Sequence, residues 1–261
     1  MATAATIEAR YAVPPPNADT QKALLLRCAV IAAASAGIVW WSRNLHWDVV
    51  WQNRWLLLNG LRATAIYSIV CLTLGLILGI ALAAARAYGH ASIGVPATLL
   101  IETVRGLPQL MVIFWVFFAI PEVTKSSPNG PVSAVIALSA IAAAYLAEDV
   151  RAGFTSLHNV QWESGYSTGL SRLQIFRYIM IPQATRNMLP AIIVTGITMI
   201  KVTTLVYVVG VVDYFRATML INNRVFAPFE LYLTAAVVYF LLCASLSCLV
   251  RKVDPKYTLV G

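Results

Sequence analysis

The chain has 261 residues, of which 59% are hydrophobic and only 11% are charged, with a formal net charge of +8. About a quarter of the residues in soluble domains are usually charged. This composition therefore excludes a chain made of one or two ordinary soluble domains. The uncharged runs at 63–85 and 231–250 are each long enough to cross a bilayer as a helix. The sequence therefore predicts an all-α polytopic membrane protein. It contains no long basic run, which argues against binding of nucleic acid.

The N-terminal part of the chain combines a polar stretch with an apolar one. Residues 1–22 are polar and include a Pro-Pro-Pro run, which predicts a disordered cytoplasmic tail. The apolar segment 23–41 is longer than the apolar core of a secretory signal peptide, and it ends in a Trp-Trp pair typical of a membrane interface. We therefore favour an additional N-terminal transmembrane helix, with residues 23–60 as one unit, over a cleaved signal.

Three tryptophans follow this segment at helical spacing. Trp47, Trp51 and Trp55 are four residues apart, so they share one face of a helix. They are compatible with an amphipathic helix on the outer surface of the membrane and equally with an ordinary packed segment.

The remaining apolar segments predict five further spans, at about 61–86, 97–120, 131–148, 187–212 and 229–250. The first of these contains Gly75 and Gly79 in a GxxxG arrangement, which permits close helix approach. About six transmembrane helices place both termini on the same side. With the termini inside, twelve Lys and Arg residues lie on the inner side and six on the outer side. This bias predicts cytoplasmic termini, including the tail 251–261, and a cytoplasmic loop at 149–186.

The loop 149–186 carries signals for two short helices. Ser171 and Gln174 form a capping box, and Gly169 stands where a preceding helix would leave through a left-handed residue. Pro182 is expected to end the second helix. These signals predict helices at about 159–168 and 171–180, and Glu163 lies near the start of the first, where the helix dipole favours an acid.

The same loop resembles a known family. The pattern E-A-A-x3-G-x9-I-x-L-P is typical of the integral-membrane permease subunits of bacterial ABC importers, and here Glu163, Gly169, Ile179 and Pro182 match it at the right spacing. The likeness covers roughly 55–250 and is greatest to the polar amino-acid uptake branch. Four motifs occur in the order of that branch: ETVRGLPQL, AYLAEDVRAGF, QWESGYSTGLSRLQIFRYIMIPQA and VFAPFELY.

This resemblance implies a MetI-like permease fold with the permease domain at 61–250 and its coupling loop at 149–186. In the family, this loop forms a coupling helix that docks on a cytoplasmic ATPase. The implied coupling residues are Trp162, Glu163, Ser164, Gly165, Gly169, Leu170, Ser171, Arg172 and Pro182. Ser164 and Gly165 replace the two usual alanines, and glycine costs a helix about 1 kcal/mol. Docking would offset this cost, or Gly165 would allow closer contact with the ATPase. Asn159 is a candidate cap for the first helix.

Polar groups inside the spans are candidates for the translocation path, because burying a charge in a membrane is costly. Lys201 lies in the fifth span, and Thr198, Thr203 and Thr204 flank it. Lys201 either binds a substrate carboxylate, pairs with an acid such as Glu148, or snorkels to the interface. Glu102 with Arg105 lies at the inner start of one span and Glu148 with Asp149 at the inner end of the next. These residues either set the topology or line the inner mouth or a gate.

Taken with the resemblance, these features predict the permease subunit of an ATP-driven importer for polar amino acids or related small solutes in the bacterial inner membrane. The alternative is a self-contained secondary transporter or channel. The chain lacks a phosphate-binding loop, so the resemblance assigns ATP and Mg to a partner ATPase dimer and no cofactor, catalytic residue or metal site to this chain. The other implied partners are a second permease subunit, identical or homologous, a periplasmic or surface-anchored substrate-binding protein, and membrane lipid.

Overall fold

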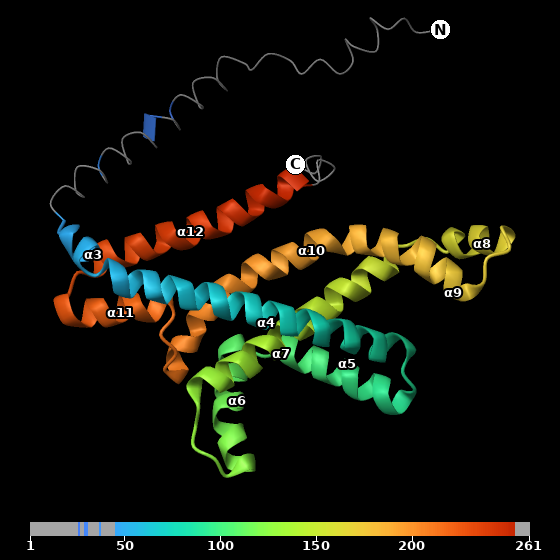
Figure 1. Ribbon diagram of the computed structural model, residues 1–261, viewed down its shortest axis with the longest axis horizontal. Coiled ribbons are helices and arrows are strands. Elements are labelled where there is room, and N and C mark those ends of the chain that lie inside the picture. The colour runs from blue at the N-terminus through green and yellow to red at the C-terminus, as the bar shows by residue number, and fades with distance from the viewer. Residues whose placement is uncertain (1–25, 27–28, 31–36, 38–44, 254–261) are drawn as a thin grey trace, which may run out of the picture. The chain divides into compact units, whose positions relative to one another are not determined.

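The computed structural model describes residues 26, 29–30, 37 and 45–253 (Figure 1). The expected tail 1–22 lies outside these residues, as do residues 254–261 and almost all of the expected helix 23–41. The chain divides into two units, residues 1–47 and residues 48–261, and the second unit holds the fold described below. Its helices are α3 (Asp48–Gln52), α4 (Arg54–Tyr88), α5 (Ala91–Gly106), α6 (Gln109–Thr124), α7 (Gly130–Thr155), α8 (Val160–Ser167), α9 (Arg172–Gln174), η1 (Ile175–Met180), α10 (Ile181–Val202), η2 (Thr203–Val209), α11 (Tyr214–Val225) and α12 (Pro228–Val253).

Helices α4 and α7 form the centre of this unit, and Figure 1 shows them side by side. Their contact is built from small residues: a Cβ added at Gly79 would lie 2.9 Å from the Ala143 carbonyl oxygen, and one at Gly75 would overlap Ala142. The GxxxG arrangement therefore serves a contact within the chain, where the missing side chains let two backbones approach. Leu138, Ile141 and further apolar residues of α7 are fully buried around this contact.

The expected third span, 97–120, is wrong as a single helix. The chain breaks between α5 and α6, which meet at an angle of 116°. Leu107 is extended, with φ −88° and ψ 147°, and Pro108 caps α6. The break follows from the proline, because its ring disfavours helical geometry in the residue before it.

Among the described residues, four helices are long and apolar enough to cross a membrane, and the bent pair α5–α6 would make a fifth. The four are Arg54–Tyr88, Gly130–Thr155, Arg172–Val209 and Pro228–Cys248. Every regular element in the ranges that the structure describes is helical, as expected. The expected count of six depends on the segment 23–41 and remains a prediction.

The tryptophan segment is packed against its own unit on one side. Helix α3 has only five residues, and its valines, Val49 and Val50, pack against a buried cluster around Leu57. Trp51 and Trp55 are 70% and 67% exposed, and the Arg54 guanidinium lies 4.7 and 5.6 Å from their rings. An amphipathic helix on the outer surface of the membrane remains a prediction.

Candidate functional site: a coupling segment and an arginine–glutamate cluster

The coupling segment, residues 156–183, has the two capping features that the sequence predicts. The backbone N–H of Ser171 donates to Gln174 Oε1 at 2.8 Å, and that of Gln174 donates to Ser171 Oγ at 3.4 Å. Gly169 has φ +76°, a left-handed conformation that glycine adopts without steric cost. Helix α8 at Val160–Ser167 agrees with the expected 159–168. Asn159 stands at its N-cap position but makes no side-chain capping hydrogen bond.

The second helix does not end at Pro182, contrary to expectation. It opens with one α-helical turn, widens into the π-helix η1, and continues as α10 with proline in its first turn. The N–H of Ile181 donates to the Phe176 carbonyl, five residues back. Proline lacks an N–H and fits the first turn of a helix. The π-helix just before it lets the helix continue past the proline, which lacks an N–H donor. Such π-helical turns are frequent at functional sites.

Gly165 faces its own chain rather than a partner surface. It is buried in α8, and an added Cβ would lie 2.6 Å from Ile175 Cγ1 and 2.9 Å from Ile175 Cδ1. Glycine in place of the usual alanine at position 165 therefore leaves room for the Ile175 side chain of η1. Ile175 occupies the space beside Gly165, and a closer ATPase contact through Gly165 remains a prediction.

The exposed side of the segment is aromatic and basic. Trp162 stacks on Tyr166 with ring centroids 6.2 Å apart, and the Arg172 guanidinium lies 5.9 Å from the Trp162 ring. A groove of about 450 Å³ is lined by Tyr88, Trp162, Arg172, Leu173 and Phe176. Leu173 is 74% exposed in this groove, and Glu163 and Ser164 are exposed beside it. An apolar groove with a cation at its rim suits docking of a protein element.

The segment is tied to the membrane helices by aromatic stacking and by amide hydrogen bonds. The Phe176 ring stacks on Phe154 of α7 at 5.6 Å and meets Tyr88 of α4 edge-on at 6.4 Å. Gln183 donates to Gln161 at 3.2 Å, and Asn187 donates to Ser156 at 2.9 Å. The segment is therefore in direct contact with α4, α7 and α10.

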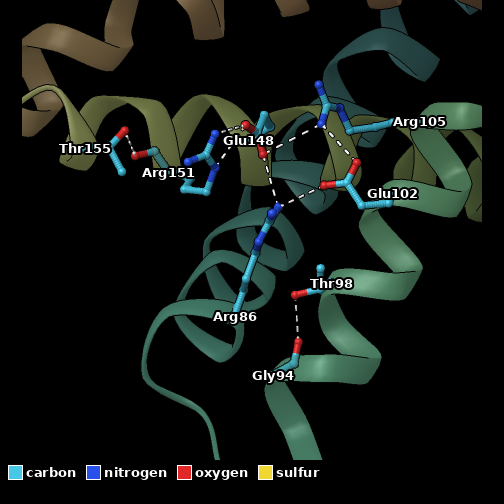
Figure 2. A network of polar contacts seen from close by, with 8 residues as sticks. All are labelled: Arg86, Gly94, Thr98, Glu102, Arg105, Glu148, Arg151 and Thr155. Atoms are coloured by element: carbon cyan, nitrogen blue, oxygen red, sulfur yellow. Dashed lines mark hydrogen bonds and ion pairs between the residues drawn. The ribbon is translucent and has the colours of Figure 1, made fainter. Parts of the chain in front are cut away.

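Two turns before the end of α7, Glu148 binds three arginines (Figure 2). Arg86 of α4 donates to it at 3.2 Å, Arg151 of α7 donates through Nε at 2.9 Å, and Arg105 of α5 lies 3.7 Å away. Glu102 of α5 accepts from Arg86 at 3.2 Å and lies 3.8 Å from Arg105. We call these five residues the inner cluster. It joins three helices through one carboxylate. It also brings together three of the four charged residues that the sequence placed at the inner mouth, namely Glu102, Arg105 and Glu148.

Asp149, which the sequence placed with Glu148 at the inner end of its span, has a partner on another helix. Its carboxylate accepts from the Thr195 hydroxyl at 2.6 Å and so links α7 to α10. This contact offsets part of the cost of an acid within an apolar helix, and nothing in the sequence marked Thr195 as the partner.

The polar residues around Lys201 are not brought to the inner cluster by any contact in the described part of the chain. Lys201 is exposed and forms no ion pair there, whereas Glu148, its expected partner, is held by arginines. The hydroxyls of Thr198, Thr203 and Thr204 all donate to carbonyls of their own helix. Thr203 is buried and Thr198 exposed. The described residues contain no group of three or more His, Cys, Asp or Glu that could hold a metal ion.

A second polar site, which sequence reasoning missed, lies at the start of α11. Asp213 is fully buried and caps the helix by accepting from the N–H of Arg216 at 2.9 Å. Its other oxygen accepts from the Tyr239 hydroxyl at 3.3 Å, and Thr64 accepts from the N–H of Tyr214 at 3.0 Å. Burial raises the pKa of the Asp213 carboxyl to about 6, against the lowering effect of these donors. The only sign of this site in the sequence was that Asp213, a residue type suited to an N-cap, precedes an amphipathic helix.

Comparison with known proteins agrees with this architecture. The chain is 31% identical to the glutamate/aspartate import permease protein GltK of Escherichia coli O157:H7, over 79% of this chain and 96% of the relative. It is 30% identical to the glutamine transport system permease protein GlnP of E. coli K12, over 82% and 98%. A solved structure, described as a crystal structure of an amino acid ABC transporter with histidines, is 27% identical, with a TM-score of 0.77 over 82% of this chain and 99% of that one.

The family comparison covers the whole region that holds the coupling segment and the inner cluster. Residues 75–259 match the model of the binding-protein-dependent transport system inner membrane component. This match spans well over half of the chain and includes the Glu163–Pro182 pattern. The chain therefore belongs to the family of inner membrane components of binding-protein-dependent transport systems.

Proposed function

We propose that this chain is the permease subunit of an ATP-driven ABC importer for polar amino acids, and that it supplies half of the translocation path. The observation that carries the proposal is the coupling segment: a rigidly capped helix pair that presents an aromatic groove and contacts three membrane helices. The relatives named for glutamate/aspartate and glutamine transport support an amino acid as the solute. Membership of a binding-protein-dependent family argues against a self-contained secondary transporter or channel.

The ATPase partner docks on the coupling segment in this proposal. Leu173 and the Trp162–Arg172 pair form the receiving groove, and the exposed Glu163 adds a charged contact. ATP and Mg are bound by that partner, and a substrate-binding protein delivers the solute to the outer side. A second permease subunit completes the path. Both termini then lie in the cytoplasm, with the chain embedded in the bacterial inner membrane and in contact with its lipid.

The solute passes two groups of polar residues in this proposal. The first is Lys201 with Thr198, Thr203 and Thr204, and the second is the inner cluster with Glu102, Arg105 and Glu148. A lysine exposed in the middle of a span is too costly to face lipid tails, so this face of α10 lines the path. The proposed division of the chain is a permease domain at 61–250 preceded by an additional unit at 23–60. Helix α4 begins at Arg54 and the compact unit at residue 48, so both extend into the proposed additional unit.

Substitution of Gly169 tests the coupling role with a matched pair of variants. Gly169 has a left-handed conformation and open space around its Cα, so only backbone strain distinguishes the substitutions. Asparagine tolerates this conformation and valine does not. We expect Gly169→Asn to co-purify with the ATPase and to support ATP-driven amino-acid uptake, and Gly169→Val to lose both. Equal uptake by the two variants, or a wild-type chain that captures no ATPase, would refute the proposal.

A further inference from the structure

Phe226, at the C-terminal end of α11, combines a strained backbone with an exposed aromatic ring. Its φ is +50°, in the left-handed region that glycine adopts freely and a bulky residue adopts only with strain. The residue is 85% exposed, so little packing within the described residues offsets that strain. Strained residues cluster at functional sites. An exposed aromatic ring at such a position is a candidate contact for a partner.

Two exposed tryptophans form a second aromatic group, around Arg54. The Arg54 guanidinium lies 4.7 Å from the centre of the Trp51 ring and 5.6 Å from that of Trp55. Its Nη1 also donates to the Trp51 carbonyl at 2.9 Å, which fixes the side chain. Tryptophan and arginine are enriched among the residues that dominate binding at protein interfaces. Because this group is already ordered, a partner would lose little free energy in ordering it.

Both aromatic groups lie at one end of the permease unit. Leu57 of α4, Val49 and Val50 of α3, and Ala227, which follows Phe226, belong to one cluster of packed apolar residues. Helix α11 packs on α4 and α12, and α12 packs on α3, as Figure 1 shows. We call the following residues of this end the aromatic platform: Trp51, Arg54, Trp55, Arg224, Val225 and Phe226.

The aromatic platform lies beyond the lipid in the proposed orientation. Tyr88, the last residue of α4, contacts Phe176 of the coupling segment, so Arg54 stands at the opposite, outer end of α4. The uncharged run 63–85 is about 35 Å long as a helix, which suffices for a hydrocarbon core of about 30 Å. Trp55 lies about 12 Å further along the helix, whereas the headgroup layer adds only about 5–8 Å on each side. This position favours a soluble partner over lipid.

The charges at this end of the unit favour an acidic partner. Arg224 is exposed and Arg54 is partly exposed, and none of the ion pairs among the described residues includes either. Of the acids at this end, Asp48 is exposed, whereas Asp213 and Glu230 are buried. Carboxylates on a partner would complement the two arginines and speed its association.

We propose that the aromatic platform is the docking surface for the soluble substrate-binding protein, which meets it with carboxylates around an apolar centre. The proposal rests on the importer function proposed above and deepens it by naming where this partner binds. Transport systems of this family are binding-protein-dependent, so a soluble partner on the outer side is expected. Phe226 and the two indoles supply the apolar contacts, and Arg54 and Arg224 supply the charged ones.

Replacement of Phe226 by asparagine separates docking from folding. Asparagine adopts the left-handed conformation with less strain, so Phe226→Asn should raise the melting temperature although it removes the ring. The permease–ATPase complex is placed in nanodiscs, and the probe is the purified substrate-binding protein of the same bacterium that, with glutamate or glutamine, most stimulates ATP hydrolysis. We expect Phe226→Asn and Trp55→Ala each to raise its half-maximal concentration at least about tenfold, as at interface hot spots. Arg224→Glu should slow association at low salt.

The matched control is Trp115→Ala, which removes an exposed indole from α6 and should leave the half-maximal concentration unchanged. The docking surface is wrong if Phe226→Asn and Trp55→Ala respond like wild type, or if weaker docking of Phe226→Asn comes with a lower melting temperature. It is also wrong if benzoylphenylalanine in place of Phe226 cross-links to lipid and not to the binding protein. If the wild-type complex contains its ATPase but no binding protein stimulates it, the importer function is wrong as well.

Discussion

Replacing Glu148 by glutamine should loosen α5 from the rest of the membrane domain. Glu148 accepts hydrogen bonds from Arg86 and Arg151 and attracts Arg105, so its charge holds α4, α5 and α7 together. Glutamine retains one acceptor oxygen but loses the charge and presents an amide N–H₂ to the arginines. A charge-assisted hydrogen bond contributes about 1.5–3 kcal/mol. Because the Glu148 side chain is only 21% exposed, we expect a loss of about 2–3 kcal/mol in total.

Hydrogen exchange measures this loss locally. Backbone amides of α5 should exchange roughly 30- to 160-fold faster in Glu148→Gln than in wild type, since local opening free energy sets the protection. The control is Glu122→Gln, which breaks an exposed pair with Lys125 that is expected to contribute little. Unchanged exchange in α5, or the same change in both variants, would refute the role of Glu148 as the residue that joins the three helices.

Three further predictions concern stability. Gly75→Ala should destabilise the protein by about 1–3 kcal/mol through overpacking against α7. Gly196→Ala, whose Cβ would have its nearest neighbour at 3.8 Å, should raise the melting temperature, because alanine gains about 1 kcal/mol of helix propensity within α10. Equal melting of these two variants would contradict the close approach. Gly165→Ala gains about 1 kcal/mol of helix propensity but collides with Ile175, so we expect a lower melting temperature that Ile175→Ala restores; a rise in the single variant would contradict this. Because the folded-state pKa of Asp213 is raised from 3.8 to about 6, its stabilising contribution is complete below about pH 4 and is lost as the pH rises through 6, a loss of roughly 3 kcal/mol. Asp213→Asn should abolish this fall in thermal stability, and a parallel pH profile for the variant would count against it.

Local signals in the sequence predicted local structure well. The capping box at Ser171 and the left-handed Gly169 were both confirmed, because each depends on residues within one helical turn. The all-helical fold followed from composition and apolar run length. The break at Pro108 was missed although the proline was visible, because an apolar run on both sides satisfies the length of a span without revealing a bend of 116°.

Contacts between distant residues could not be predicted in the same way. Glu148 was a candidate from its position inside an apolar helix, but its three partners include Arg86 and Arg105 from two other helices. Only the packing of α4 and α5 on α7 brings them together. The continuation of the helix past Pro182 was also unpredictable, since the π-helix before it reflects how η1 packs on α8 around Ile175.

The close contact between α4 and α7 limits how the transporter can change shape. Backbones that touch where Gly75 and Gly79 lack side chains cannot slide past each other without a clash, so the two helices travel together as a rigid body. The pivots of any access cycle must then lie where the chain is already interrupted: at Leu107–Pro108, in η1, and at the left-handed Gly210 after η2. Helix α10 lies between two of these points and α6 begins at a third, so we expect these two helices to move most.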